Sequence, residues 1–154
     1  MKFTHPTDRR RERGFTLIEV LVVLVILGVI ASIAIQTALY AFDVARLGST
    51  VGSMRGLTTV IMAYETAFSG VPQSGLLPVS TLEPLLRPMG APVPLRDGWG
   101  NEMFYESLII NGEPSFRVYA YGKDGTPDGA IPGVWIDFFS DVVMESGTFI
   151  QTKW

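Results

Sequence analysis

Cysteine is absent from this 154-residue chain, and its single histidine, His5, lies close to the first residue. Without cysteine the chain has no disulfide bond, no thiolate zinc site and no cysteine nucleophile. One histidine leaves almost no material for a Ser–His–Asp triad or a histidine metal site. The composition therefore argues against most classes of enzyme, and the length fits one modest domain with appendages.

Charge is distributed unevenly along the chain. Residues 1–14 carry five basic and two acidic side chains, whereas the remaining residues carry seven basic and thirteen acidic ones. A basic flank before an apolar run stays on the cytoplasmic side of a membrane, so we expect the chain beyond the run to be translocated. Nucleic-acid binding by the arginines is the alternative, but they are few and adjoin the apolar run. We therefore expect no nucleic-acid partner.

A long apolar run extends from Phe15 to Ile35, and no charged residue occurs from Val20 to Phe42. Because about 20 apolar residues let a helix cross the hydrocarbon core, residues 15–42 are predicted to form a transmembrane helix. The run is too long for a buried strand. A cleaved signal peptide is the serious alternative, although its apolar core usually has about 7–15 residues and is followed by a small-residue cleavage site.

Glu19 is the one charged residue inside the apolar run. A carboxylate near the membrane centre costs about 2.5–3.5 kcal/mol on insertion scales, and such groups usually have a partner. The run offers no positive charge, so the partner must come from the chain's own end or from another subunit. A cut between Gly14 and Phe15 would create an α-amine four residues away. The alternative is a glutamate at interfacial depth whose side chain reaches water.

The junction between the basic leader and the apolar run reads GFTLIE, from Gly14 to Glu19. This junction resembles that of type IV prepilins and type II secretion pseudopilins. The resemblance implies that a membrane peptidase cuts after Gly14 and N-methylates Phe15, and that Glu19 pairs with a neighbour's N-terminal amine during filament assembly. One departure is Gln36, where members of the family often carry a helix-breaking proline.

Beyond the apolar run, large apolar residues recur at spacings of three and four. They are Leu47, Val51, Met54, Leu57, Ile61, Tyr64 and Phe68. This spacing is typical of an amphipathic helix whose apolar face lies on a core. We therefore expect residues 43–70 to continue the first helix. The helix should extend to about Ser69, because Gly70 and Pro72 stop it.

Residues 71–96 form a proline-rich connecting segment, with six prolines between Pro72 and Pro94. Prolines at this density argue against long regular elements. One short helix is predicted from Thr81 to Leu86, with Ser80 or Thr81 as its N-cap.

The pattern changes to strands after Arg96. The expected strands are residues 103–105, 107–110, 116–121, 135–139 and 148–152. Asn111-Gly112 between two of them is the strongest two-residue hairpin signal. The expected fold class is α+β: a long N-terminal helix, transmembrane in its first half and amphipathic in its second, packed on a small antiparallel sheet within residues 97–154.

The head also resembles the major pseudopilin of type II secretion, which implies the pilin fold. The resemblance lies in the turn DGWG from Asp97 to Gly100, in Tyr105 and in the loop that begins at Gly122. Trp99 in the turn is most simply interpreted as a core anchor, flanked by glycines that permit tight turns.

The loop from Gly122 to Gly129 contains two carboxylates, Asp124 and Asp128, and three glycines. Calcium takes about 6–8 oxygen ligands from carboxylates, carbonyls and water. The resembled pseudopilins bind calcium in the corresponding loop, which implies one structural calcium held by Asp124, Asp128 and, from the next element, Asp137. The alternative is that Asp-Gly and Pro-Asp-Gly are ordinary turn sequences that need no metal.

We expect a structural subunit and not an enzyme, because neither histidine nor cysteine remains once the leader is removed. A hydrolase using two of Glu102, Glu106 and Asp97 is the remaining catalytic alternative. A bitopic, membrane-anchored periplasmic binding module is the stronger alternative, but it leaves Glu19 and the GFTLIE junction unexplained.

The resemblance implies a filament subunit that polymerises with its own copies through the apolar helices and drives protein export across the outer membrane. Its further partners would be the prepilin peptidase, minor pseudopilins, an inner-membrane assembly platform and, before assembly, membrane lipid. The precursor would lie in the bacterial inner membrane as a single-pass protein, with a cytoplasmic N-terminus and a periplasmic head. The assembled subunit would lie in a periplasmic pseudopilus or a surface pilus.

Overall fold

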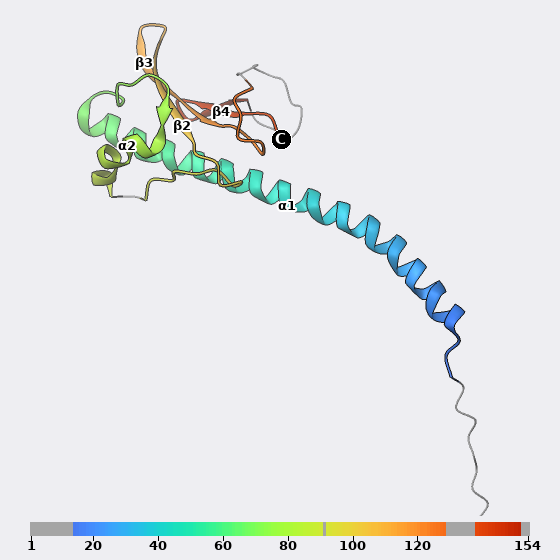
Figure 1. Ribbon diagram of the computed structural model, residues 1–154. Coiled ribbons are helices and arrows are strands. Elements are labelled where there is room, and N and C mark those ends of the chain that lie inside the picture. Colours follow the sequence, from blue (N-terminus) through green and yellow to red (C-terminus); the bar gives the residue numbers. More distant parts are fainter. Residues whose placement is uncertain (1–13, 91, 129–137, 152–154) are drawn as a thin grey trace, which may run out of the picture. The chain divides into compact units, whose positions relative to one another are not determined.

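The computed structural model describes residues 14–90, 92–128 and 138–151 (Figure 1). The elements in chain order are α1 (Leu17–Phe68), β1 (Leu77–Pro78), α2 (Val79–Leu86), the 3-10 helix η1 (Arg87–Met89), β2 (Phe104–Ile110), β3 (Glu113–Ala120), β4 (Val142–Glu145) and β5 (Thr148–Gln151). One long helix followed by an antiparallel sheet confirms the predicted α+β class. The chain divides into two compact units, residues 1–40 and residues 41–154.

In the first unit, residues 17–40 of α1 are helical and exposed throughout. The helix is long and apolar enough to cross a membrane. It begins at Leu17, two residues after the predicted start, and Gly14, Phe15 and Thr16 precede its first turn.

In the second unit, the continuation of α1 supplies one side of the hydrophobic core. Its buried residues are Leu47, Thr50, Val51, Met54, Leu57, Thr58, Val60 and Ile61. The predicted apolar stripe is thus confirmed from Leu47 to Ile61, and Tyr64 packs against the same core. The prediction was wrong for Phe68, which is 61% exposed and lies at the last residue of the helix. Its ring contacts the ring of Tyr64 instead, with the centroids 4.5 Å apart.

The five strands form one antiparallel sheet in the order β1-β2-β3-β4-β5. The predicted hairpin at Asn111-Gly112 is confirmed, since Ile110 pairs with Glu113 and both turn residues have positive φ, 54° and 86°. Two positive φ values at the centre are what a type I′ turn requires. The two strands predicted before this turn are one continuous strand, β2, and its partner β3 begins at Glu113 rather than at residue 116.

The last hairpin joins β4 to β5 through Ser146 and Gly147, which also have positive φ. The strand predicted at residues 148–152 is confirmed as β5 as far as Gln151. Of the strand predicted at residues 135–139, residues 135–137 lie outside the described residues, and Phe138 and Phe139 form bends instead of strand. The strand β4 and the two-residue strand β1 were not predicted from the sequence.

The short helix α2 begins at Val79, and the predicted caps Ser80 and Thr81 were wrong. Pro78 precedes the helix in an extended conformation and makes no side-chain cap hydrogen bond. The Ser80 hydroxyl is hydrogen-bonded to Glu102 instead, and the backbone N–H of Val79 donates to the carbonyl of Met103. Pairing with the chain before β2 therefore sets the start of α2.

The core of the second unit lies between α1, α2 and the inner face of the sheet (Figure 1). Tyr105, Phe116, Val118 and Met144 from the strands are buried against it. The buried Tyr105 hydroxyl donates to the carbonyl of Pro72 at 2.7 Å, which ties the connecting segment to β2.

Candidate functional site

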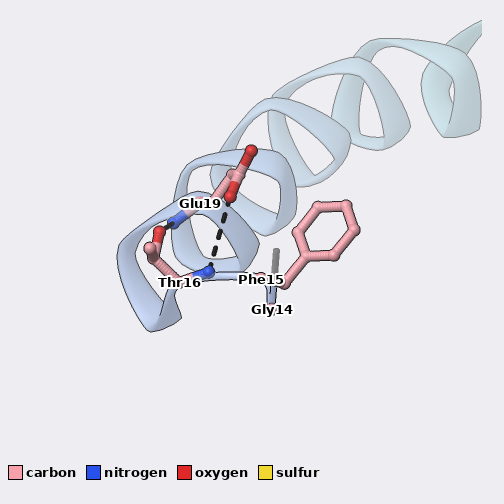
Figure 2. Close-up of a pocket in the computed structure, with 4 residues that line it drawn as sticks. All are labelled: Gly14, Phe15, Thr16 and Glu19. Carbon is pink, nitrogen blue, oxygen red and sulfur yellow. Dashed lines mark hydrogen bonds between the residues drawn. The ribbon is translucent and has the colours of Figure 1, made fainter. Parts of the chain in front are cut away.

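The predicted cleavage junction lies immediately before α1. Figure 2 shows a hollow lined by Gly14, Phe15, Thr16 and Glu19. The Phe15 side chain is 81% exposed, and neither Gly14 nor Phe15 belongs to a helix. The three predicted residues Gly14, Phe15 and Glu19 are therefore brought together, and the peptide bond between the first two lies outside the helix.

Thr16 and Glu19 form a reciprocal pair of hydrogen bonds at the start of α1 (Figure 2). The backbone N–H of Glu19 donates to the Thr16 hydroxyl at 3.3 Å, and the backbone N–H of Thr16 donates to Oε2 of Glu19 at 3.4 Å. This arrangement is a capping box, in which side chains satisfy N–H groups that the first turn leaves unpaired. It sets the helix start at Leu17.

The sequence predicts a positively charged partner for Glu19, whereas the partner in the structure is the backbone N–H of Thr16. The signal was present, because a threonine followed three residues later by a glutamate is the capping-box pattern. The N-terminal end of a helix also favours a negative charge. The site can therefore hold a carboxylate in place beside the position where cleavage would create an amine.

The structure describes two of the three predicted calcium ligands, Asp124 and Asp128. The Asp124 carboxylate accepts a hydrogen bond from the backbone N–H of Thr126 at 3.2 Å, and both Asp124 and Asp128 are exposed. Asp137 lies outside the described residues. Within the part of the chain that the structure describes, no three acidic, histidine or cysteine side chains are grouped as a metal site requires.

Asp141 is a carboxylate at this loop that sequence analysis did not single out. It is buried, and its Oδ2 accepts a hydrogen bond from the backbone N–H of Asp128 at 3.1 Å. The backbone N–H of Lys123 donates to the carbonyl of Phe138 at 2.8 Å. The loop is thus attached at both ends to the segment that leads into β4. The sequence held no local signal for this position, because the strand that follows Asp141 was not predicted either.

The base of the loop is also attached to α1. The Lys123 ammonium lies 2.8 Å from Oδ2 of Asp43 and 5.5 Å from the centre of the Phe139 ring. The hydrogen bond from Lys123 lowers the pKa of the Asp43 carboxyl below its usual value. The Trp99 indole N–H donates to the other oxygen of Asp43 at 3.5 Å. Trp99 packs against the core as predicted, and it also bonds to the helix.

The DGWG turn contacts α1 through its first glycine. A Cβ on Gly98 would lie 2.0 Å from the carbonyl oxygen of Arg46, and the Gly98 N–H donates to the Thr50 hydroxyl at 2.9 Å. Oδ1 of Asp97 accepts hydrogen bonds from the backbone N–H groups of Trp99 and Asn101. Burial raises the pKa of the Asp97 carboxyl.

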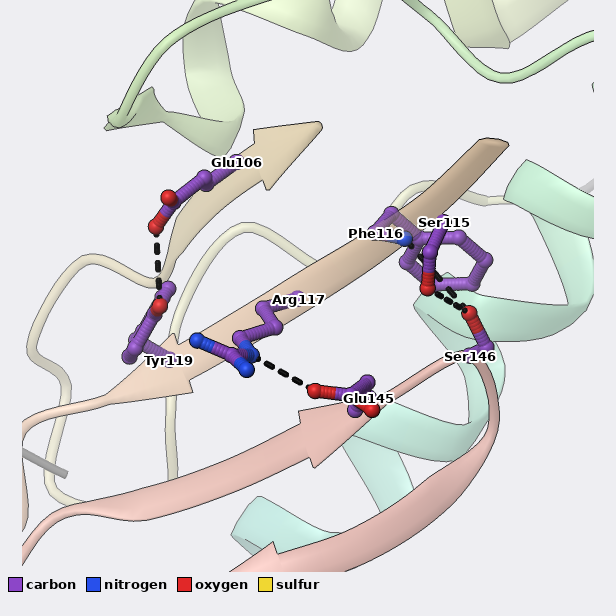
Figure 3. A network of polar contacts seen from close by, with 7 residues as sticks. All are labelled: Glu106, Ser115, Phe116, Arg117, Tyr119, Glu145 and Ser146. Atoms are coloured by element: carbon purple, nitrogen blue, oxygen red, sulfur yellow. Dashed lines mark hydrogen bonds and ion pairs between the residues drawn. The ribbon is translucent and has the colours of Figure 1, made fainter. Parts of the chain in front are cut away.

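A polar network connects neighbouring strands of the sheet (Figure 3). The Tyr119 hydroxyl donates to Oε2 of Glu106 at 2.8 Å, and the Arg117 Nε donates to Oε2 of Glu145 at 2.7 Å. Cross-strand pairs of this kind stabilise a sheet. The network therefore gives these side chains a structural role.

The carboxylates considered for hydrolysis bond to different groups. Glu102 is hydrogen-bonded to Ser80, Glu106 accepts from Tyr119, and Asp97 accepts from the backbone of its own turn. General acid–base hydrolysis by two carboxylates needs both around one substrate. These hydrogen bonds supply no such pairing.

Comparison with known proteins adds independent findings. Residues 9–35 match the prokaryotic N-terminal methylation motif. The type II secretion system core protein G of Dickeya chrysanthemi is 32% identical over 128 residues, which cover 77% of this chain and 82% of that protein. The proteins of the same name from Pseudomonas aeruginosa and Vibrio cholerae are each 29% identical, over 136 and 132 residues, and the alignments cover 92% and 86% of those proteins. No solved structure matches the chain significantly.

Proposed function

Since the chain belongs to the type II secretion system core protein G family and is a pseudopilin subunit, we propose that it is cut after Gly14 and polymerises through α1. The bitopic binding module is not favoured, because it explains neither the methylation motif nor these relatives. The relatives are structural proteins, and we propose the same non-enzymatic role here.

The observation that carries this proposal is the exposed apolar helix over residues 17–40, which begins at the Thr16–Glu19 capping box. A continuous apolar surface of this length requires lipid or neighbouring copies to cover it. We propose that membrane lipid covers this apolar surface before assembly and that the helices of other copies cover it in the filament.

Glu19 would contribute to assembly by charge pairing. Removal of residues 1–14 turns the Phe15 nitrogen into an amine that carries a positive charge at neutral pH. In a filament, this amine of one copy would pair with Glu19 of a neighbour. The Coulomb attraction between two charges is stronger away from water than at a surface. A misaligned register would leave a buried charge without its partner, which is costly, so the pair favours one register between copies.

The proposed location follows from the charge asymmetry of the chain. The basic leader would stay in the cytoplasm, α1 would cross the inner membrane once, and the acidic second unit would lie in the periplasm. The prepilin peptidase, minor pseudopilins and an inner-membrane assembly platform are the proposed partners. The assembled pseudopilus would drive protein export across the outer membrane.

We also propose one structural calcium at the loop from Gly122 to Gly129, with Asp124, Asp128 and Asp137 as candidate ligands. The support is chemical: the available side chains offer oxygen donors, which calcium prefers, and the first two are exposed in one short loop. The ion would order the loop and take no part in catalysis.

The test of the proposed function is terminal analysis of the mature protein by mass spectrometry. We expect an N-methylated Phe15 as the first residue. An intact residue 1, or a cut near Ala41 as expected of a signal peptide, would reject the prepilin assignment.

A further inference from the structure

The polar side chains of the exposed segment of α1 differ in how their hydrogen bonds are satisfied. The Ser32 hydroxyl donates to the carbonyl of Val29 at 2.7 Å, and the Thr37 hydroxyl donates to the carbonyl of Ile33 at 3.2 Å. The side-chain amide of Gln36 forms no hydrogen bond with any residue that the structure describes. An amide offers two donors and one acceptor, so Gln36 carries the unmet hydrogen-bonding capacity of this segment.

Gln36 lies well inside the uncharged stretch. The nearest charged residue toward the second unit is Asp43, seven residues or about 10 Å further along the helix. The nearest charged residue on the other side is Glu19, seventeen residues away. An amide in hydrocarbon without a hydrogen-bond partner costs several kcal/mol, and lipid tails supply none. A protein partner would remove this cost.

The surroundings of Gln36 on the helix surface allow another helix to approach closely. Ser32 and Gly28 lie four and eight residues before it, along one ridge of the helix. A Cβ at Gly28 would meet no other atom within 4 Å, and all three residues are exposed. Small residues beside a polar one are the usual composition of helix contacts in membranes.

We propose that the Gln36 amide hydrogen-bonds to the same helix of a second copy of this chain, on the face formed by Gly28, Ser32 and Gln36. This inference rests on the proposed function, because it takes α1 to be embedded in the membrane and to associate with its own copies. A second copy is the occupant because the helix is the surface through which the proposed filament forms.

The test uses the full chain in detergent micelles or lipid vesicles. Because the chain has no cysteine, a single Glu113→Cys substitution at an exposed position of β3 gives one site for a donor or acceptor dye. Energy transfer between the two labelled populations then measures self-association. The test variant is Gln36→Leu, and the matched control is Thr37→Val, whose lost hydroxyl is already bonded within its own helix.

We expect Gln36→Leu to weaken self-association about 3- to 30-fold, the range that interhelical hydrogen bonds produce. Thr37→Val should associate as the parent chain does, and Gln36→Asn, which keeps an amide, should weaken association less than Gln36→Leu. Equal association of Gln36→Leu and the parent would overturn the proposal. So would an effect that appears only in native membranes and not with the purified chain, because the partner would then be another protein.

Failure of this inference can be told apart from failure of the proposed function. If Glu19→Ala blocks filament formation while Gln36→Leu forms filaments and associates normally, the function stands and the Gln36 contact does not. If the parent chain is neither cleaved after Gly14 nor polymerised, the function itself fails.

Discussion

Lys123 and Asp43, eighty residues apart in the chain, form an ion pair with 2.8 Å between Nζ and Oδ2. This pair fixes the loop that carries Asp124 to the helix α1. Because Asp43 also accepts the indole N–H of Trp99, one helical carboxylate attaches two separate loops. This attachment depends on the negative charge of Asp43, so it should weaken when the Asp43 carboxylate is protonated.

We expect Asp43→Asn to lower the melting temperature slightly at pH 7, because partly exposed ion pairs contribute little. The folded pKa of Asp43 lies below the usual 3.8, so its stabilisation is present above pH 3.8 and is lost as pH falls through the folded pKa. The difference between variant and parent should therefore disappear in strong acid. Thermal melts followed by circular dichroism at pH 7 and in acid check this. Lys123→Met should lower the melting temperature by about as much as Asp43→Asn does. A constant difference at all pH values would contradict it.

Gly98→Ala should destabilise the second unit by about 1–3 kcal/mol, as overpacking does. The new Cβ would lie 2.0 Å from the Arg46 carbonyl oxygen, so the turn must move off the helix. The control is Gly52→Ala, which meets no atom within 4 Å and should stabilise α1 by about 1 kcal/mol. Denaturant unfolding of the two variants measures both changes. Equal stability of the two variants would show that the turn does not contact α1 closely.

Asp97 should act in the opposite direction to Asp43. Burial raises its folded pKa, so its contribution to stability is greatest below the unfolded value of 3.8 and falls as pH rises through the folded pKa. The melting temperature of Asp97→Asn, relative to that of the parent, should therefore be higher at pH 7 than at pH 3. Melting temperatures of both proteins at the two pH values test this. If the variant loses stability relative to the parent from pH 3 to pH 7, the folded pKa of Asp97 is not raised.

Replacement of Glu19 should separate its charge from its capping role. We expect Glu19→Ala to abolish or sharply reduce filament assembly while membrane insertion remains. Glu19→Gln keeps an acceptor for the Thr16 N–H but has no charge, so it should also fail to assemble if charge pairing drives assembly. Electron microscopy of filaments and membrane fractionation give the two measurements. Normal filaments from the glutamine variant would leave only the cap as the function of Glu19.

Removal of calcium should lower the melting midpoint of the full chain, because a ligand that binds only the folded state stabilises it. The measurement is a melt with and without a chelator, repeated for Asp124→Asn, which should respond less. An unchanged midpoint in the parent chain would remove the calcium proposal.

The elements that could be predicted are those whose signal is local. The spacing from Leu47 to Ile61 and the Asn111-Gly112 dipeptide each specify an element within a few residues. By contrast, β1 contains Pro78, which argues against a strand, and it exists because both of its residues pair with β2 at the sheet edge. Partners distant in sequence decided these positions, and local patterns do not report them.

The candidate site divides in the same way. The junction from Gly14 to Glu19 is local, so the sequence contained both the predicted cleavage position and the cap. The contacts of Asp43 with Lys123 and of Asp128 with Asp141 depend on how loops return to α1 and to β4. Acidic residues at these positions are common on protein surfaces, so nothing in the sequence distinguished Asp43 or Asp141 beforehand.

The contact between Gly98 and the helix backbone has a consequence for how this protein can vary. Deleting one residue of α1 between Asp43 and Arg46 would turn the two by about 100° relative to each other. The carboxylate that meets Lys123 and the carbonyl that meets Gly98 could then no longer both be reached from the same side. Natural variants should therefore tolerate changes of side chain along this stretch more readily than any change in its length.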